Sequence, residues 1–156
     1  METLKRIPND MAVSSLLEMQ NVAVIGVNDD SNQAAYVDAK GLIDLGYQVH
    51  LVNPEFAESG CKILGQKVYA SLVDIGDLVE LVNLHISSNE VDYWMHDLSE
   101  RMERRADIEG VWFEPGIESN ESIVDANDFG WIVVQNCCIL KEIRLRDNGN
   151  VIIAST

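Results

Sequence analysis

The chain alternates between short, continuous apolar runs and longer stretches in which apolar residues recur every three or four positions. Val22 to Val27 is a run of the first kind, which is typical of a strand covered on both faces. Asn32 to Leu45 is a stretch of the second kind, with the period of a helix that buries one face, and Gly46 follows its end. This alternation predicts an α/β protein built on parallel strands.

The same two patterns predict the remaining elements. Further strands are expected at 47–52, 66–69, 78–86, 111–113 and 131–134, and further helices at 11–19, about 88–105 and 122–127, with a helical turn at 71–75. Asn53-Pro54 ends the second strand because the residue before proline avoids helical geometry and proline donates no hydrogen bond. Residues 55–65 show no such period and are predicted to be a loop.

The C-terminal segment follows a different pattern. Residues 142–146 alternate apolar with charged positions, Asn148-Gly149 is a strong hairpin-turn pair, and residues 151–153 are apolar again. No repeat, linker or low-complexity segment divides the chain. We therefore predict one domain, residues 1–156, with a doubly wound, mostly parallel, Rossmann-like sheet and a C-terminal β-hairpin.

Composition and charge narrow the choice of partners. The formal net charge is −15, which opposes binding to nucleic acid and to anionic lipid surfaces. No apolar run approaches the roughly 18 residues of a membrane helix, and residues 1–8 contain no signal-peptide core. We expect a soluble, cytoplasmic protein whose three cysteines, Cys61, Cys137 and Cys138, are idle thiols.

The turn after the first strand is a candidate anion site. Gly26 ends that strand, and the free amides at the start of the following helix point toward the crevice of such a fold. The dinucleotide fingerprint is absent, because Asn28 and Ser31 occupy its second and third glycine positions, and no Walker lysine follows. Gly26 could therefore serve a ligand or only a tight turn. Asp29 and Asp30 oppose an anion unless they face water.

Five features occur together along the chain: Val22-Ala-Val-Ile-Gly26, Gly46-Tyr-Gln-Val49 with Val52-Asn-Pro54, Ile63-Leu-Gly-Gln-Lys-Val-Tyr-Ala-Ser-Leu-Val-Asp-Ile75, Gly110-Val-Trp112 with Gly116-Ile117, and Cys138. With them, the chain from about Asn21 to Glu142 resembles the small stand-alone CoA-binding-domain family, which is related to the CoA-binding domain of the succinyl-CoA synthetase alpha subunit. The resemblance implies a Rossmann-like fold and CoA as the cofactor.

The chain departs from that family at its phosphate contacts. The family usually has Ser in the loop after the first strand and Arg or Lys five residues later, where this chain has Asn28 and Gln33. It tends to have Phe-Arg-Arg where this chain has His85-Ile86-Ser87, and Cys-Pro-Lys where this chain has Cys138-Ile-Leu140. Neutral hydrogen bonds would therefore replace charge-assisted contacts to phosphate.

Apolar and backbone groups of the resemblance remain. Gly26 and Val27 would allow close approach of the ligand, and Val52-Asn53-Pro54 would form a wall for adenine or simply end the strand. The candidate cofactor-binding residues are Gly26, Val27, Asn28, Gln33, Val52, Asn53, Pro54, His85, Ile86 and Gly116.

No catalytic motif is evident. The histidines share no motif with each other or with a nucleophile; they are His50, His85 and His96. Glu114, Glu118 and Glu121 gather after a strand, where they could bind Mg²⁺ or form a solvated acidic loop, and we favour the loop. We expect no catalytic residue and no metal site, and so a protein that is not an enzyme.

Two functions remain open, beside a less favoured third in which the acidic cluster of Glu114, Glu118 and Glu121 serves a metal enzyme. The first is a non-enzymatic nucleotide-binding module for CoA or an acyl-CoA, as the resemblance implies. The second is a regulatory or interaction protein that keeps the fold and has lost CoA binding, which the missing basic residues favour. Tyr93 and Trp94 are neighbours on a helix and cannot both face inward, so a homodimer contact through one of them is a further candidate.

Overall fold

The computed structural model describes residues 9–117 and 130–154, and its centre is a six-stranded sheet in which all the paired strands are parallel. The strand order is β3-β2-β1-β4-β5-β6. The strands are β1 (Asn21–Ile25), β2 (Gln48–Val52), β3 (Val68–Tyr69), β4 (Leu81–Leu84), β5 (Gly110–Phe113) and β6 (Ile132–Gln135). The order reverses between β1 and β4, so the crevice typical of doubly wound sheets lies at their carboxyl ends. The predicted fold class is confirmed.

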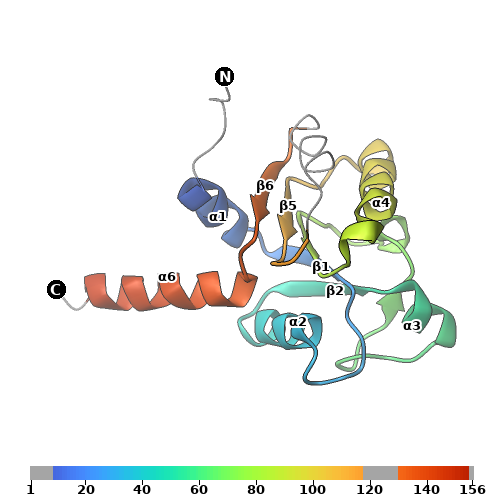
Figure 1. The fold of residues 1–156 in the computed structure, drawn as a ribbon, viewed down its shortest axis with the longest axis horizontal. Helices are drawn as coiled ribbons and strands as arrows, with labels where there is room; N and C mark the ends of the chain where they lie inside the picture. The colour runs from blue at the N-terminus through green and yellow to red at the C-terminus, as the bar shows by residue number, and fades with distance from the viewer. Residues whose placement is uncertain (1–8, 118–129, 155–156) are drawn as a thin grey trace.

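Helices connect the strands and cover the sheet (Figure 1). They are α1 (Asn9–Leu17), α2 (Ala34–Asp44), α3 (Pro54–Ser59), α4 (Val91–Arg104) and α6 (Ile139–Ala154), with short 3-10 turns η1 (Leu72–Asp74) and η2 (Ser88–Glu90). One apolar core joins the sheet to α1, α2 and α6 through residues such as Leu16, Leu42 and Ile139. The other joins it to η1 and α4 through Leu72 and Leu98. None of the described helices meets the length and hydropathy needed to cross a bilayer.

A buried arginine fixes the loop between β3 and β4. The fully buried Arg101 of α4 pairs with Asp107, with Nη2 and Oδ2 2.7 Å apart. Its Nη1 donates to the carbonyl oxygens of Leu72 and Ile75 at 2.7 and 2.6 Å. Its Nη2 donates to the Asp77 carbonyl oxygen at 2.7 Å. The hydrogen bonds of this guanidinium therefore hold the segment between β3 and β4, whose only helical element is the short turn η1, against α4.

The predicted C-terminal hairpin is wrong, because residues 139–154 form the helix α6. Ile139, Leu140 and Ile143 lie on one helical face and are buried in the core shared with α2. A side-chain atom placed on Gly41 of α2 would meet Leu140 Cδ1 at 2.6 Å, so the two helices approach closely. Asn148-Gly149 lies inside α6, so the turn that this pair favours locally does not form.

Residues 55–65 are not all loop, since α3 begins at Pro54 and ends at Ser59. The helix expected at 122–127 lies outside the described residues. On α4, Trp94 is buried and Tyr93 is 61 % exposed, as expected from their adjacent positions.

Candidate functional site

The carboxyl ends of β1 and β4 meet at Gly26. Its φ of +103° favours glycine, and a Cβ at this position would overlap the carbonyl oxygen of His85. The Gly26 N–H donates to the Val52 carbonyl oxygen at 2.9 Å, which ties the turn to the end of β2. The glycine is therefore required by the packing of three strand ends, whether or not a ligand binds.

The loop between β1 and α2 uses its own side chains to satisfy several backbone amides. Gln33 Oε1 accepts from the Asn28 N–H at 2.8 Å, and Gln33 Nε2 donates to the Gly26 carbonyl oxygen at 2.8 Å. Asn28 Oδ1 accepts from the Asp30 N–H, and Asp30 Oδ1 from the Asn32 N–H, each at 2.9 Å. Side-chain oxygens thus already accept the hydrogen bonds of backbone amides that could otherwise donate to a phosphate. Asp29 and Asp30 are exposed and face water.

Asn53 joins the end of β2 to the same loop. Its Nδ2 donates to the Val27 carbonyl oxygen at 2.9 Å, and its Oδ1 accepts from the Glu55 N–H at 3.0 Å. Asn53 is therefore the N-cap of α3, and Pro54 occupies the first helical turn, where the missing N–H costs nothing. Asn53-Pro54 ends the strand by starting a helix.

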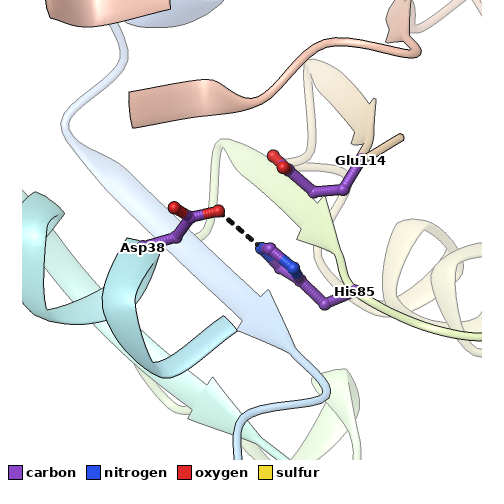
Figure 2. A group of neighbouring side chains, drawn as sticks. All are labelled: Asp38, His85 and Glu114. Carbon is purple, nitrogen blue, oxygen red and sulfur yellow. Dashed lines mark ion pairs between the residues drawn. The ribbon is translucent and has the colours of Figure 1, made fainter. Parts of the chain in front are cut away.

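A second group of polar side chains lies buried at this edge, at the carboxyl ends of β4 and β5 and against α2. We call Asp38, His85 and Glu114 the carboxylate–histidine cluster, and Figure 2 shows these three side chains pointing toward one another. His85 Nε2 lies 3.0 Å from Asp38 Oδ2 and 2.9 Å from Asn83 Oδ1. Asn83 Nδ2 and the Ile139 N–H donate to Glu114 Oε2 at 2.8 and 3.1 Å. Asn83 thus links the histidine to the glutamate.

Burial dominates the electrostatics of this cluster. It raises the pKa of Glu114 to about 7, against the opposing influence of His85 and of the hydrogen bond from Asn83. Cys138 is a neighbour whose Sγ donates to Asp38 Oδ1 at 3.9 Å, and burial raises the pKa of its thiol, which therefore stays protonated near neutrality. Glu114 can consequently exist in either protonation state close to physiological pH.

The structure brings together only some of the candidate residues. Gly26, Val27, Asn28, Gln33 and Asn53 are joined by the hydrogen bonds described above. Val52 is the partner of Ile25 in the β1–β2 register, and Ile86 packs against the core on the α4 side. Gly116 lies in the turn after β5, where its carbonyl oxygen accepts a hydrogen bond from Ser88 Oγ at 3.4 Å.

The interpretation of Glu114 as part of a solvated acidic loop is wrong, because its side chain is buried. Glu118 and Glu121 lie outside the described residues. Sequence reasoning also missed Asp38 and Asn83. Asp38 interrupts the apolar face that Ala35 and Leu42 define on α2, and Asn83 interrupts the apolar run of β4; such buried polar positions are the pattern that could have revealed them.

The sheet order, the glycine turn and the crevice at the switch point define a Rossmann-like domain of the kind that binds nucleotides. The chain belongs to the CoA binding domain family, whose sequence model matches residues 20–144. This match spans β1 to β6 and includes both polar regions at the carboxyl edge.

One curated protein is similar to this chain in sequence, and solved structures share its fold. Over 133 residues the chain is 24% identical to YneT, an uncharacterized protein of Bacillus subtilis. The alignment covers 85% of this chain and 92% of that protein. A hypothetical protein from Pyrococcus horikoshii has a similar structure, with a TM-score of 0.76, 24% identity and coverage of 91% and 94% of the two chains. A Thermus thermophilus structure has a TM-score of 0.76 and 24% identity, and the match covers 89% of this chain and 99% of that chain.

Proposed function

We propose that this chain is a non-enzymatic module that binds CoA or an acyl-CoA at the carboxyl edge of the sheet, above Gly26. The observation that carries the proposal is the family match over residues 20–144, which includes the complete β1–α2 loop. Family members are described as CoA binding domains, and the crevice of this fold is the usual place for a nucleotide.

The loop supplies backbone groups rather than charged side chains. When Gln33 Oε1 leaves the Asn28 N–H, that amide becomes free to donate to a phosphate oxygen beside the start of α2. The exchange replaces a neutral acceptor with an anionic one, which makes a stronger hydrogen bond. Asp29 and Asp30 are exposed, so water screens their repulsion of the ligand.

One observation favours a second function. The amides of Asn28, Asp30 and Asn32 are already satisfied by side chains of the same loop. A loop that satisfies itself in this way needs no ligand to be stable, as expected for a regulatory or interaction protein that keeps the fold without binding CoA. The two functions differ in whether a ligand displaces Gln33.

Thermal unfolding with CoA, acetyl-CoA, NAD and ATP separates the two functions. A ligand at a hundred times its dissociation constant stabilises the folded state by about 2.7 kcal/mol, which is a measurable rise in Tm. We expect CoA and acetyl-CoA to raise Tm more than NAD or ATP. Absence of any shift at millimolar CoA would rule out the CoA-binding function and leave the second one standing.

A charge variant tests the location of the phosphate. Gln33→Arg places a positive charge at the start of α2 and should tighten CoA binding by about tenfold, since a charge-assisted hydrogen bond replaces a neutral one. Gln48→Arg makes the same change at the exposed amino end of β2, on the opposite edge of the sheet. Equal effects of both variants would mean that only net charge matters and that the phosphate does not lie at this loop.

A further inference from the structure

Three side chains that are distant in the sequence converge at the carboxyl edge of the sheet. Asp38 comes from α2, His85 follows β4 and Glu114 follows β5, and one potential ligand atom from each lies within 4.8 Å of the other two (Figure 2). We propose that this carboxylate–histidine cluster binds a divalent transition-metal ion, with Zn²⁺ as the representative. Nothing in the sequence groups these three residues, because no two of them share a motif; the sequence raised a metal only for Glu114 together with Glu118 and Glu121.

The spacing of the cluster suits a single ion. Asp38 Oδ2 and His85 Nε2 are 3.0 Å apart. Two ligands that each lie about 2.0–2.2 Å from one zinc ion are separated by about 3–3.5 Å at the usual coordination angles. A small inward movement of a Glu114 oxygen completes a set of three protein ligands, which leaves a further position for water or another donor.

The burial of Asp38 is an independent reason to expect a cation. Its side chain is only 5 % exposed, and its Oδ2 atom has no hydrogen-bond partner among the described residues, even though His85 Nε2 lies nearby. Two buried carboxylates face one imidazole, and in the described part of the chain neither carboxylate has an ion pair with lysine or arginine. A divalent cation balances this charge and gives Asp38 Oδ2 a partner.

The chemistry of the donors selects the class of ion. One imidazole nitrogen with two carboxylate oxygens is a set that zinc and neighbouring transition metals accept, whereas Mg²⁺ and Ca²⁺ prefer oxygen alone. Coordination requires an unprotonated His85 Nε2, so the imidazole keeps its proton on Nδ1 and Asn83 Oδ1 gives up its contact with Nε2. The Ile139 N–H still donates to Glu114 and orients its carboxylate.

The test is calorimetric titration of Zn²⁺ into chelator-treated protein without any nucleotide, so that its outcome is independent of CoA binding. We expect one ion per chain. Asp38→Asn and Glu114→Gln keep the shape of each side chain, and each should weaken Zn²⁺ binding by about tenfold or more. Asp44 of α2 and His96 of α4 have exposed side chains, so Asp44→Asn and His96→Gln are the matched controls, and both should leave the affinity unchanged.

Two titration results would overturn the proposal. One is the absence of stoichiometric Zn²⁺ binding in the folded wild-type chain. The other is equal loss of binding in the cluster variants and in the controls, which would assign the ion to surface groups. Circular dichroism of each variant confirms that it is folded, and Co²⁺ absorption spectra of the wild type report the ligands directly. A spectrum without d–d bands of bound Co²⁺ would also contradict the site.

Discussion

Replacing Glu114 with glutamine should change how the free energy of unfolding depends on pH. At acidic pH it should change the free energy of unfolding itself much less. The Glu114 side chain is buried, and its Oε2 accepts hydrogen bonds from Asn83 and from the Ile139 backbone. A glutamine Oε1 can accept the same two hydrogen bonds and carries no charge at any pH. The substitution therefore removes one titration while it preserves the shape of the site.

The structure sets the sign and size of this effect. Burial raises the pKa of Glu114 from 4.5 to about 7, and each pKa unit is worth about 1.4 kcal/mol, so ionising the folded protein costs about 3 kcal/mol relative to the unfolded chain. Below pH 4.5 both states are protonated and this contribution is fully present. Between pH 4.5 and 7 only the unfolded chain ionises, so stability falls as the pH rises.

Urea unfolding between pH 4.5 and 8 measures this difference, with EDTA present to exclude metal ions. The free energy of unfolding of Glu114→Gln minus that of the wild type should grow by about 3 kcal/mol across this range. Glu58→Gln removes an exposed carboxylate from α3, and its difference from the wild type should stay nearly constant. A constant difference for Glu114→Gln would refute the claim that burial governs this carboxyl group.

Two other substitutions test the framework around the site by urea unfolding. Gly26→Ala should lower the free energy of unfolding by about 2 kcal/mol or more, because its Cβ would overlap the His85 carbonyl oxygen and its φ is +103°. Gly46→Ala, with a φ of +97° and nothing within 4 Å, carries only the backbone strain, and an equal loss there would disprove the overlap argument. Arg101→Met should lower the free energy of unfolding by about 3–5 kcal/mol, because the largely buried carboxylate of Asp107 loses its ion-pair partner. Arg104 is exposed, so Arg104→Met should lower it by about 0.5 kcal/mol or less. Similar losses for the two arginines would show that the buried ion pair contributes little.

The strands and the first crossover could be predicted because their information is local. β1 is an uninterrupted buried run, and α2 has a regular apolar period that ends just before Gly46. The C-terminal helix could not be predicted in the same way, because Asn148-Gly149 favours a turn and the contact of Leu140 with Gly41 of α2, near the start of α6, leaves no local pattern. The first turns of α6 pack into the core through Ile139, Leu140 and Ile143, and such tertiary contacts can override a local preference.

The candidate site, too, could be predicted from the sequence only in part. Gly26, Asn28 and Gln33 were identified correctly as one loop, but the bond from the Asn28 N–H to Gln33 Oε1 depends on a turn geometry that spacing does not define. The carboxylate–histidine cluster draws on α2 and on the ends of β4 and β5, so its members meet only when the strands are in register. Residues that act together across a sheet edge leave almost no pattern along the chain.

In the proposed binding mode, a CoA phosphate replaces Gln33 Oε1 as the acceptor of the hydrogen bond from the Asn28 amide. The most direct measurement is a ¹H–¹⁵N correlation NMR titration of the labelled chain with CoA, following the backbone amides of Gly26 and Asn28 and, as a reference, that of Gln48 at the opposite edge. Saturable shifts of the Gly26 and Asn28 signals, with Gln48 unaffected, are the predicted result. Unchanged Gly26 and Asn28 signals at millimolar CoA would contradict this binding mode.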